Sequence, residues 1–102
     1  MSTLTIQKNQ EDTKLTVSLI GRVDTTTSPQ FEEEVSPSLD GVTELVLDFS
    51  QTEYISSAGL RVIVSLYKKL NAKGGRLVAC RVNHTVMNVF ITTGLIDFLE
   101  IV

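Results

Sequence analysis

Hydrophobic and polar residues alternate over the first twenty positions of the chain. Leu4 and Ile6 have polar neighbours, and a second alternating run leads up to Gly21 with the apolar residues Leu15, Val17 and Leu19. Alternation with a period of two is typical of strands with one buried face. The polar residues 9 to 12 between the runs predict a turn. The pattern therefore predicts an antiparallel hairpin.

A nearly continuous apolar run at residues 45 to 49 is interrupted only by Asp48. Such a run predicts a central strand that is covered on both faces. A polar turn follows, and then a long helix that begins at Ser56 or Ser57, because either hydroxyl can accept a hydrogen bond from a free backbone amide. The helix ends before Gly74 and Gly75. Its apolar positions at helical spacing, predicted to face the core, are Leu60, Ile63, Val64, Tyr67 and Leu70.

Two further helices are predicted around the central unit. The first starts at Ser28 before Pro29 and is ended early by Pro37. The last is capped by Asn83 and stopped by Gly94, with Val86, Val89, Phe90 and Thr93 on one face. A strand is predicted over Arg76–Val82, and a short final strand over residues 96 to 102.

The predicted order is strand, strand, helix, strand, helix, strand, helix, strand. Helices between strands imply right-handed crossovers and parallel neighbours, while the opening hairpin is antiparallel. The fold class is therefore α/β, with a five-stranded mixed sheet and about three helices. At 102 residues the chain has room for one domain, expected over residues 1–102.

Composition and charge narrow the classes of partner. The net charge is -3, and basic residues are scattered apart from Lys68 and Lys69, so direct nucleic-acid binding is not expected. No apolar run approaches the roughly 20 residues of a membrane span, and residues 1 to 10 lack the apolar core of a signal peptide. We expect a cytoplasmic protein without membrane insertion.

No large exposed apolar stripe is evident, so a monomer is expected.

Two features that could suggest reactive chemistry have simpler interpretations. The single cysteine, Cys80, cannot form an internal disulfide and is predicted to be a small buried residue in a strand. The acidic triplet 32–34 is predicted to be a solvated helix face, because adjacent helical positions diverge rather than converge on a metal ion. No metal or cofactor is expected.

Catalysis is not supported by the motifs present. A triad could be composed of Ser57, His84 and Asp24, but G-x-S-x-G is absent and the single histidine makes the choice uninformative. We expect His84 to lie on the surface near a helix start. A small serine hydrolase is the alternative from another class, and it predicts ester turnover that disappears in Ser57→Ala.

Ser57 has two interpretations that the residues alone leave open. A serine at a helix start commonly caps the helix. Alternatively it is a phosphorylation site, because a phosphate adds about -1.5 to -2 charges and a helix N-terminus tolerates an anion.

Several short motifs together resemble a known family. They are GRVD at 21–24, DFS at 48–50, YI at 54–55, SSAGL at 56–60 and TGL at 93–95. In this order and spacing they resemble the STAS domain, as found in bacterial anti-sigma factor antagonists, over nearly the whole chain.

The resemblance implies a regulator of transcription that works by partner switching. Family members bind an anti-sigma factor with serine kinase activity and a histidine-kinase-like ATPase fold, which releases the sigma factor. The kinase inactivates the antagonist by phosphorylation at this helix start, and a serine phosphatase restores it. On this chain the phosphoacceptor position falls on Ser57. Ser56 stands where the family usually has aspartate, so that either recognition by the kinase is altered or Ser56 is a competing acceptor. The alternative is a STAS scaffold or accessory subunit of a transport or signalling complex, without phosphorylation.

The predicted partner-binding face combines two loops that follow strands and precede helices, and that should therefore lie at the same end of the sheet. Its residues are Asp24, Thr25, Thr26, Ser56, Ser57, Gly59 and Arg61. Structural roles compete with this assignment: Asp24 as a loop cap, the two threonines as turn residues, and Gly59 as a site of close packing. Leu60 is expected to enter the core.

Overall fold

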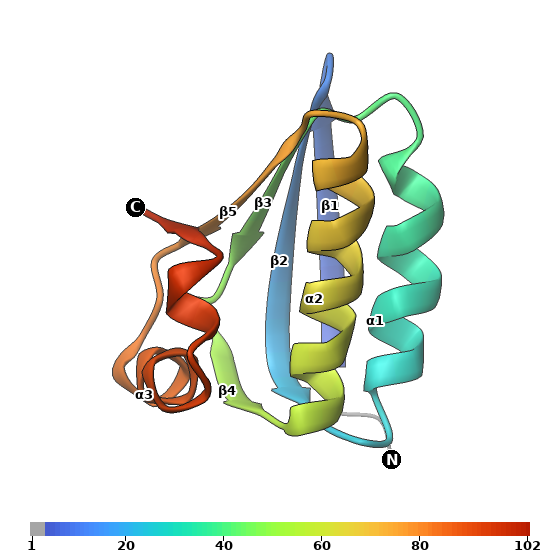
Figure 1. Ribbon diagram of the computed structural model, residues 1–102. Coiled ribbons are helices and arrows are strands. Elements are labelled where there is room, and N and C mark those ends of the chain that lie inside the picture. Colours follow the sequence, from blue (N-terminus) through green and yellow to red (C-terminus); the bar gives the residue numbers. More distant parts are fainter. Residues whose placement is uncertain (1–3) are drawn as a thin grey trace.

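The computed structural model describes residues 4 to 102 and contains a six-stranded mixed sheet (Figure 1). The strands lie in the order β1-β2-β3-β5-β6, and β4 pairs with β2 off this path. Their bounds are β1 Leu4–Glu11, β2 Lys14–Val23, β3 Glu44–Asp48, β4 Thr52–Ile55, β5 Arg76–Cys80 and β6 Glu100–Ile101. The predicted α/β class is confirmed, with β3 in the middle of the sheet.

Strand β2 has partners on both of its edges. It pairs antiparallel with β1 along its length, from Leu4↔Gly21 to Glu11↔Lys14. On its other edge the first half pairs parallel with β3, and the last residues pair parallel with β4. Strands β3 and β4 therefore follow one another along the same edge of β2, separated by a short turn.

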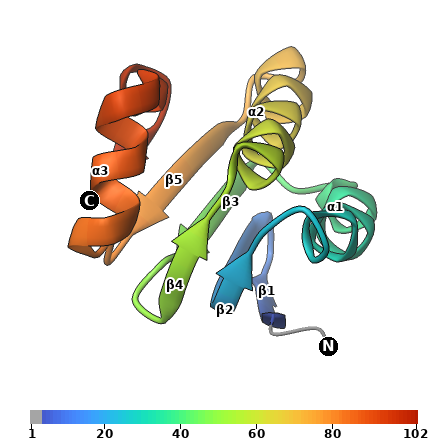
Figure 2. The ribbon, with the colours of Figure 1, turned by 90° about the horizontal axis from the view of Figure 1, so that it is seen from below.

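Three α-helices and two short 3-10 helices connect the strands. They are α1 Ser28–Val35, η1 Ser36–Leu39, α2 Ser57–Ala72, α3 His84–Thr93 and η2 Leu95–Asp97. Helices α1 and α2 lie side by side against one face of the sheet, and α3 lies next to β4 (Figures 1 and 2). The loop after β2 and the start of α2 consequently meet at one end of the molecule.

The hydrophobic core lies between this helical layer and the sheet. Its fully buried members come from β2 and β3 on one side and from α1, α2 and α3 on the other: Leu15, Val17, Leu19, Leu45, Leu47, Phe31, Val35, Ile63, Leu66, Leu70 and Phe90. The rings of Phe49 and Phe90 meet edge to face, with centroids 5.4 Å apart, and join α3 to this core. In the part of the chain from residue 4 onward, no helix is long and apolar enough to cross a membrane.

Strand β4 differs from the expectation, because the sequence predicts a turn at residues 52 to 55 before the long helix. Only Thr52 and Ile55 are buried in this segment, so it lacks the alternation that predicts a strand. Its pairing with β2 forms the strand, with a register shift between Gly21 and Arg22. The hydroxyl of Thr52 donates to the carbonyl oxygen of Leu19 at 2.6 Å.

The predicted boundaries differ from the structure at three places. The hairpin strands continue through the residues assigned to the turn, and the turn is placed at Asp12, with φ 56. Strand β5 ends at Cys80 rather than Val82, because Arg81 has φ 51 and leaves the extended conformation. Of the predicted last strand over residues 96 to 102, the first two residues belong to the 3-10 helix η2, and only β6 pairs with β5.

The face of α2 that packs on the core is rotated from the predicted one. Val62, Ile63, Leu66 and Leu70 are buried, together with Gly59. The predicted core residues Leu60, Val64 and Tyr67 are only half-buried and border the surface. The helix is apolar around much of its circumference, so its own spacing did not specify the buried face.

Candidate protein-interaction site

The two serines at the start of α2 have different structural roles. Ser56 is the N-cap residue, and its Oγ accepts a hydrogen bond from the backbone amide of Gly59 at 3.3 Å. Ser57 is the first residue of the helix and is exposed. Within residues 4 to 102, its hydroxyl has no hydrogen-bond partner. Capping is therefore performed by Ser56, and the Ser57 hydroxyl is accessible.

The start of α2 is joined directly to the end of β2. Val23 pairs with Ile55 at the end of β4, and the backbone amide of Ser56 donates to the carbonyl oxygen of Val23 at 2.8 Å. Figure 2 shows the ends of β2 and β4 side by side, leading into α1 and α2. The loop of residues 24–28 and the Ser57 hydroxyl therefore lie at the same end of the sheet.

Asp24 organises the loop between β2 and α1. Its Oδ1 accepts hydrogen bonds from the backbone amides of Thr26 at 3.0 Å and Thr27 at 3.1 Å. The hydrogen bond from the Thr27 amide is the main reason that the pKa of Asp24 lies below its ordinary value. The carboxylate is therefore charged at neutral pH and stabilises the loop, which leaves the side chains of Thr25 and Thr26 exposed.

Gly59 lies against the end of the sheet because no side chain fits there. A Cβ atom at this position would lie 2.7 Å from Cγ1 of Val23 and 3.0 Å from Cγ1 of Ile55. The glycine is buried, so its predicted place among the partner-binding residues is better described as support for the helix start. The close approach holds Ser57 at a defined position.

Arg61 lies between two surface depressions. The α2 groove, as we name the first, is lined by Ser57, Leu60, Arg61, Val64, Ser65, Lys68 and Lys69. The second, between α1 and α2, is lined in part by Thr25, Glu32 and the same Arg61. Arg61 forms no ion pair with any of the described residues. The structure thus places Arg61 next to both predicted loops, with its guanidinium available.

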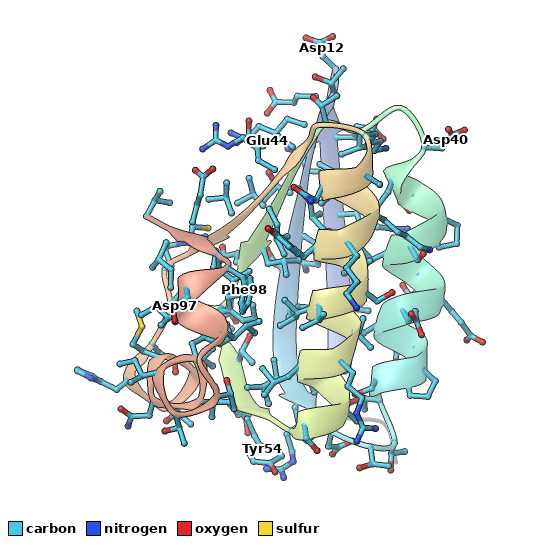
Figure 3. The ribbon with its side chains drawn as sticks, in the orientation of Figure 1. Asp12, Asp40, Glu44, Tyr54, Asp97 and Phe98 are labelled. Carbon is cyan, nitrogen blue, oxygen red and sulfur yellow. The ribbon has the colours of Figure 1, made fainter. Side chains whose placement is uncertain are left out.

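Sequence reasoning missed two exposed side chains at this end of the sheet. The guanidinium of Arg22 lies over the ring of Tyr54, 4.7 Å from its centroid, and its Nε is 3.7 Å from Oδ2 of Asp24. Tyr54 projects from the lower end of β4 in Figure 3. The pairing of β2 with β4 places the two residues opposite each other, so the contact depends on the unpredicted strand.

The remaining candidates for reactive chemistry are dispersed. His84 is exposed at the start of α3, and no hydrogen bond joins it to Ser57 or Asp24 in the described part of the chain. Cys80 is half-buried rather than fully buried, and burial together with the nearby charge of Asp48 raises its pKa. Among residues 4 to 102 no group of three acidic, histidine or cysteine side chains could hold a metal ion.

Comparison with known proteins relates this chain to a family of regulators. The family model for the STAS domain matches residues 5–102. The protein BtrV of Bordetella bronchiseptica, named as an anti-sigma factor antagonist, is 35% identical over 91 residues, covering 88% of this chain and 78% of BtrV. The anti-sigma-B factor antagonist of Listeria monocytogenes is 30% identical over 101 residues, covering 96% and 88% of the two chains.

Solved structures show the same fold. The anti-sigma factor antagonist SpoIIAA in its unphosphorylated form has a TM-score of 0.85 and 21% identity, covering 96% of this chain and 88% of SpoIIAA. The phosphorylated form of SpoIIAA from Bacillus has a TM-score of 0.77 and 20% identity, covering 96% and 91%. These relatives are named as regulatory antagonists and not as enzymes. The chain therefore belongs to the STAS domain family and, within it, to the anti-sigma factor antagonist family.

Proposed function

We propose that this chain is an anti-sigma factor antagonist controlled by phosphorylation of Ser57. The unphosphorylated form binds an anti-sigma factor with serine kinase activity and releases the sigma factor. Phosphorylation by that kinase abolishes binding, and a serine phosphatase restores it. The chain acts as a single STAS domain over residues 1–102, in the cytoplasm, as a monomer.

The observation that carries this proposal is the division of roles between Ser56 and Ser57. Because Ser56 provides the cap, the Ser57 hydroxyl is exposed and unbonded at the positive end of a 16-residue helix. A phosphate at that position is compatible with the helix dipole. Ser56 is a poorer acceptor, since it is half-buried and its oxygen is engaged with Gly59.

The surface around Ser57 suits recognition by a protein. Asp24 orders the loop that exposes Thr25 and Thr26, and Arg61 projects beside the same end of α2. Adding two negative charges here changes the electrostatic match with a partner without requiring the domain to refold. A 100-fold loss of affinity corresponds to only about 2.8 kcal/mol.

A capture experiment with three variants tests the proposal. Ser57→Ala, Ser57→Asp and Thr92→Asp are used as baits in lysate of the native host, and bound proteins are identified by mass spectrometry. Thr92 is exposed on α3, so Thr92→Asp adds the same charge away from the site. We expect an anti-sigma factor with an ATPase fold on the Ser57→Ala and Thr92→Asp baits, and at least 100-fold less on Ser57→Asp. Equal capture by all three baits would refute the switch, and capture of transporter components would favour the scaffold alternative.

The acceptor itself is identified by incubation of the captured kinase with ATP. We expect one phosphate on wild type and on Ser56→Ala, mapped to Ser57, and none on Ser57→Ala. Phosphate on Ser56 in the wild-type protein would contradict the assignment.

A further inference from the structure

An apolar hollow lies between the middle of α2 and η2. It is lined by Val64, Tyr67, Lys68, Leu95 and Phe98. The rings of Tyr67 and Phe98 meet edge to face, with centroids 6.0 Å apart. Phe98 is nevertheless 59% exposed, whereas the neighbouring Leu95 and Leu99 are buried. Figure 3 shows Phe98 in the space between η2 and α2. The ring of Phe98 thus packs against Tyr67 and presents most of its surface to solvent.

This hollow is continuous with the α2 groove. Val64 and Lys68 line both of them. The combined surface, which we name the α2–η2 surface, extends from Ser57 at the helix start to Phe98. A protein that reaches Ser57 can therefore also contact Phe98 along the same helix face.

The charge of the α2–η2 surface is opposite to that of the chain as a whole. The net charge of the protein is -3, but no carboxylate lines either depression. Arg61 and Lys68 form no ion pair with other described residues, while Lys69 donates to the hydroxyl of Ser36. These two unpaired cations lie beside the apolar residues of the hollow. The surface therefore favours a partner that carries both carboxylates and an apolar side chain.

We propose that the α2–η2 surface binds an acidic segment of a partner protein. The segment inserts an apolar side chain against Tyr67 and Phe98 and places carboxylates next to Arg61 and Lys68. Aromatic residues in a partly enclosed hollow are typical anchor points of protein interfaces, and complementary rim charges orient the partner. This inference rests on the proposed function in one respect, which is that the partner is a protein.

The test is a selection of random peptides of about 12 residues, displayed on phage, against the immobilised full chain. We expect enriched peptides with an apolar residue flanked by at least two Asp or Glu. Titration of the best peptide against variants locates its site. Phe98→Ser and Lys68→Glu should each weaken binding at least tenfold, about 1.4 kcal/mol. Ile91→Ser is the matched control, because Ile91 is 57% exposed on α3 and lies outside the surface.

Four outcomes would overturn the proposal. Two concern the peptides: enrichment of peptides without acidic residues, and peptide binding that survives both Phe98→Ser and Lys68→Glu. The other two point to a different occupant: binding of phosphatidylserine vesicles in place of peptides, and self-association of the chain that Phe98→Ser abolishes. Thermal unfolding of each variant establishes that it remains folded. The two proposals are measured separately, because peptide binding is titrated on the unphosphorylated wild-type chain and the switch is tested with the Ser57 baits. If peptide binding persists but the phosphorylation switch fails, only the proposed function is wrong.

Discussion

Gly59 and Val23 approach so closely that a Cβ atom at position 59 would lie 2.7 Å from Cγ1 of Val23. Val23 is fully buried and β-branched, so its side chain has little freedom to move aside. The contact fixes the first turn of α2 against the end of β2. The position of Ser57 relative to the loop of residues 24–28 depends on this contact.

Gly59→Ala should destabilise the protein, although alanine favours a helix. Overpacking costs about 1–3 kcal/mol, which exceeds the helix preference of up to about 1 kcal/mol. Chemical denaturation measures the change in the free energy of unfolding. Thr92→Ala, at an exposed position of α3, serves as control and should change it by less than about 0.5 kcal/mol. A Gly59→Ala variant as stable as wild type would show that the close contact relaxes without cost.

Ser56→Ala should cost more stability than Ser57→Ala. Loss of an N-cap side chain costs about 0.5–2 kcal/mol, and the Ser56 hydrogen bond of 3.3 Å is long, so we expect the lower half of this range. The Ser57 hydroxyl has no partner in the described structure, so its removal should change stability little. Denaturant titration of both variants compares them. The reverse order would assign the cap to Ser57.

Ser57→Asp should leave the fold intact or stabilise it slightly. A negative charge in the first turn of a helix contributes about 0.3–1 kcal/mol at low ionic strength. Ser57→Lys is the matched control and should be less stable than Ser57→Ala. Thermal unfolding in low salt measures all three variants. If Ser57→Asp unfolds at a lower temperature than Ser57→Ala, a loss of partner binding by Ser57→Asp could not be attributed to the interface.

Asn83→Ala should be among the most destabilising polar substitutions. The Asn83 side chain accepts from the amide of Val86 at 3.0 Å and donates to the carbonyl oxygens of Phe49 at 3.0 Å and Thr52 at 2.8 Å. The substitution removes the N-cap of α3 and a hydrogen bond to the carbonyl oxygen of each of two buried residues. It should lower the free energy of unfolding by about 2–4 kcal/mol. Asn88→Ala, at an exposed position of the same helix, is the control and should be nearly neutral. Equal unfolding midpoints for the two variants would contradict this.

Asp48 should make stability depend on pH in the acid range. Burial raises its pKa, but hydrogen bonds from Ser50 and Arg81 outweigh burial, so the pKa lies below the ordinary 3.8. The stabilisation is complete above the unfolded-state pKa and is lost as the pH falls through the lower folded-state pKa. Asp48→Asn should lose about 1–3 kcal/mol at neutral pH, with a smaller difference from wild type in strong acid. A difference that stays constant between pH 7 and pH 2 would exclude this linkage. Asp40→Asn, which makes the same substitution at an exposed position before β3, is the control.

Most of the candidate site could be predicted from the sequence, but the roles within it could not. The motifs identified the helix start and the loop after β2, Arg61 follows the SSAGL motif, and the structure brings all three to one end of the sheet. Which serine caps the helix depends on backbone geometry: Ser56 is extended, with ψ 174, and Ser57 is helical. The Arg22–Tyr54 contact could not be predicted without β4, and the residues of β4 have no distinctive hydrophobic pattern.

The sequence by itself determined the elements with strong local signals. The alternation in β1 and β2, the apolar run of β3, the Asn83 cap and the αL conformation of Gly94 follow from residues close in the chain. Tertiary structure alone decided two features: β4 forms because β2 has a free edge beyond β3, and α2 buries Val62 and Leu66 because the sheet and α1 select one of its several apolar faces. Both depend on contacts between distant segments, and a local pattern does not contain them.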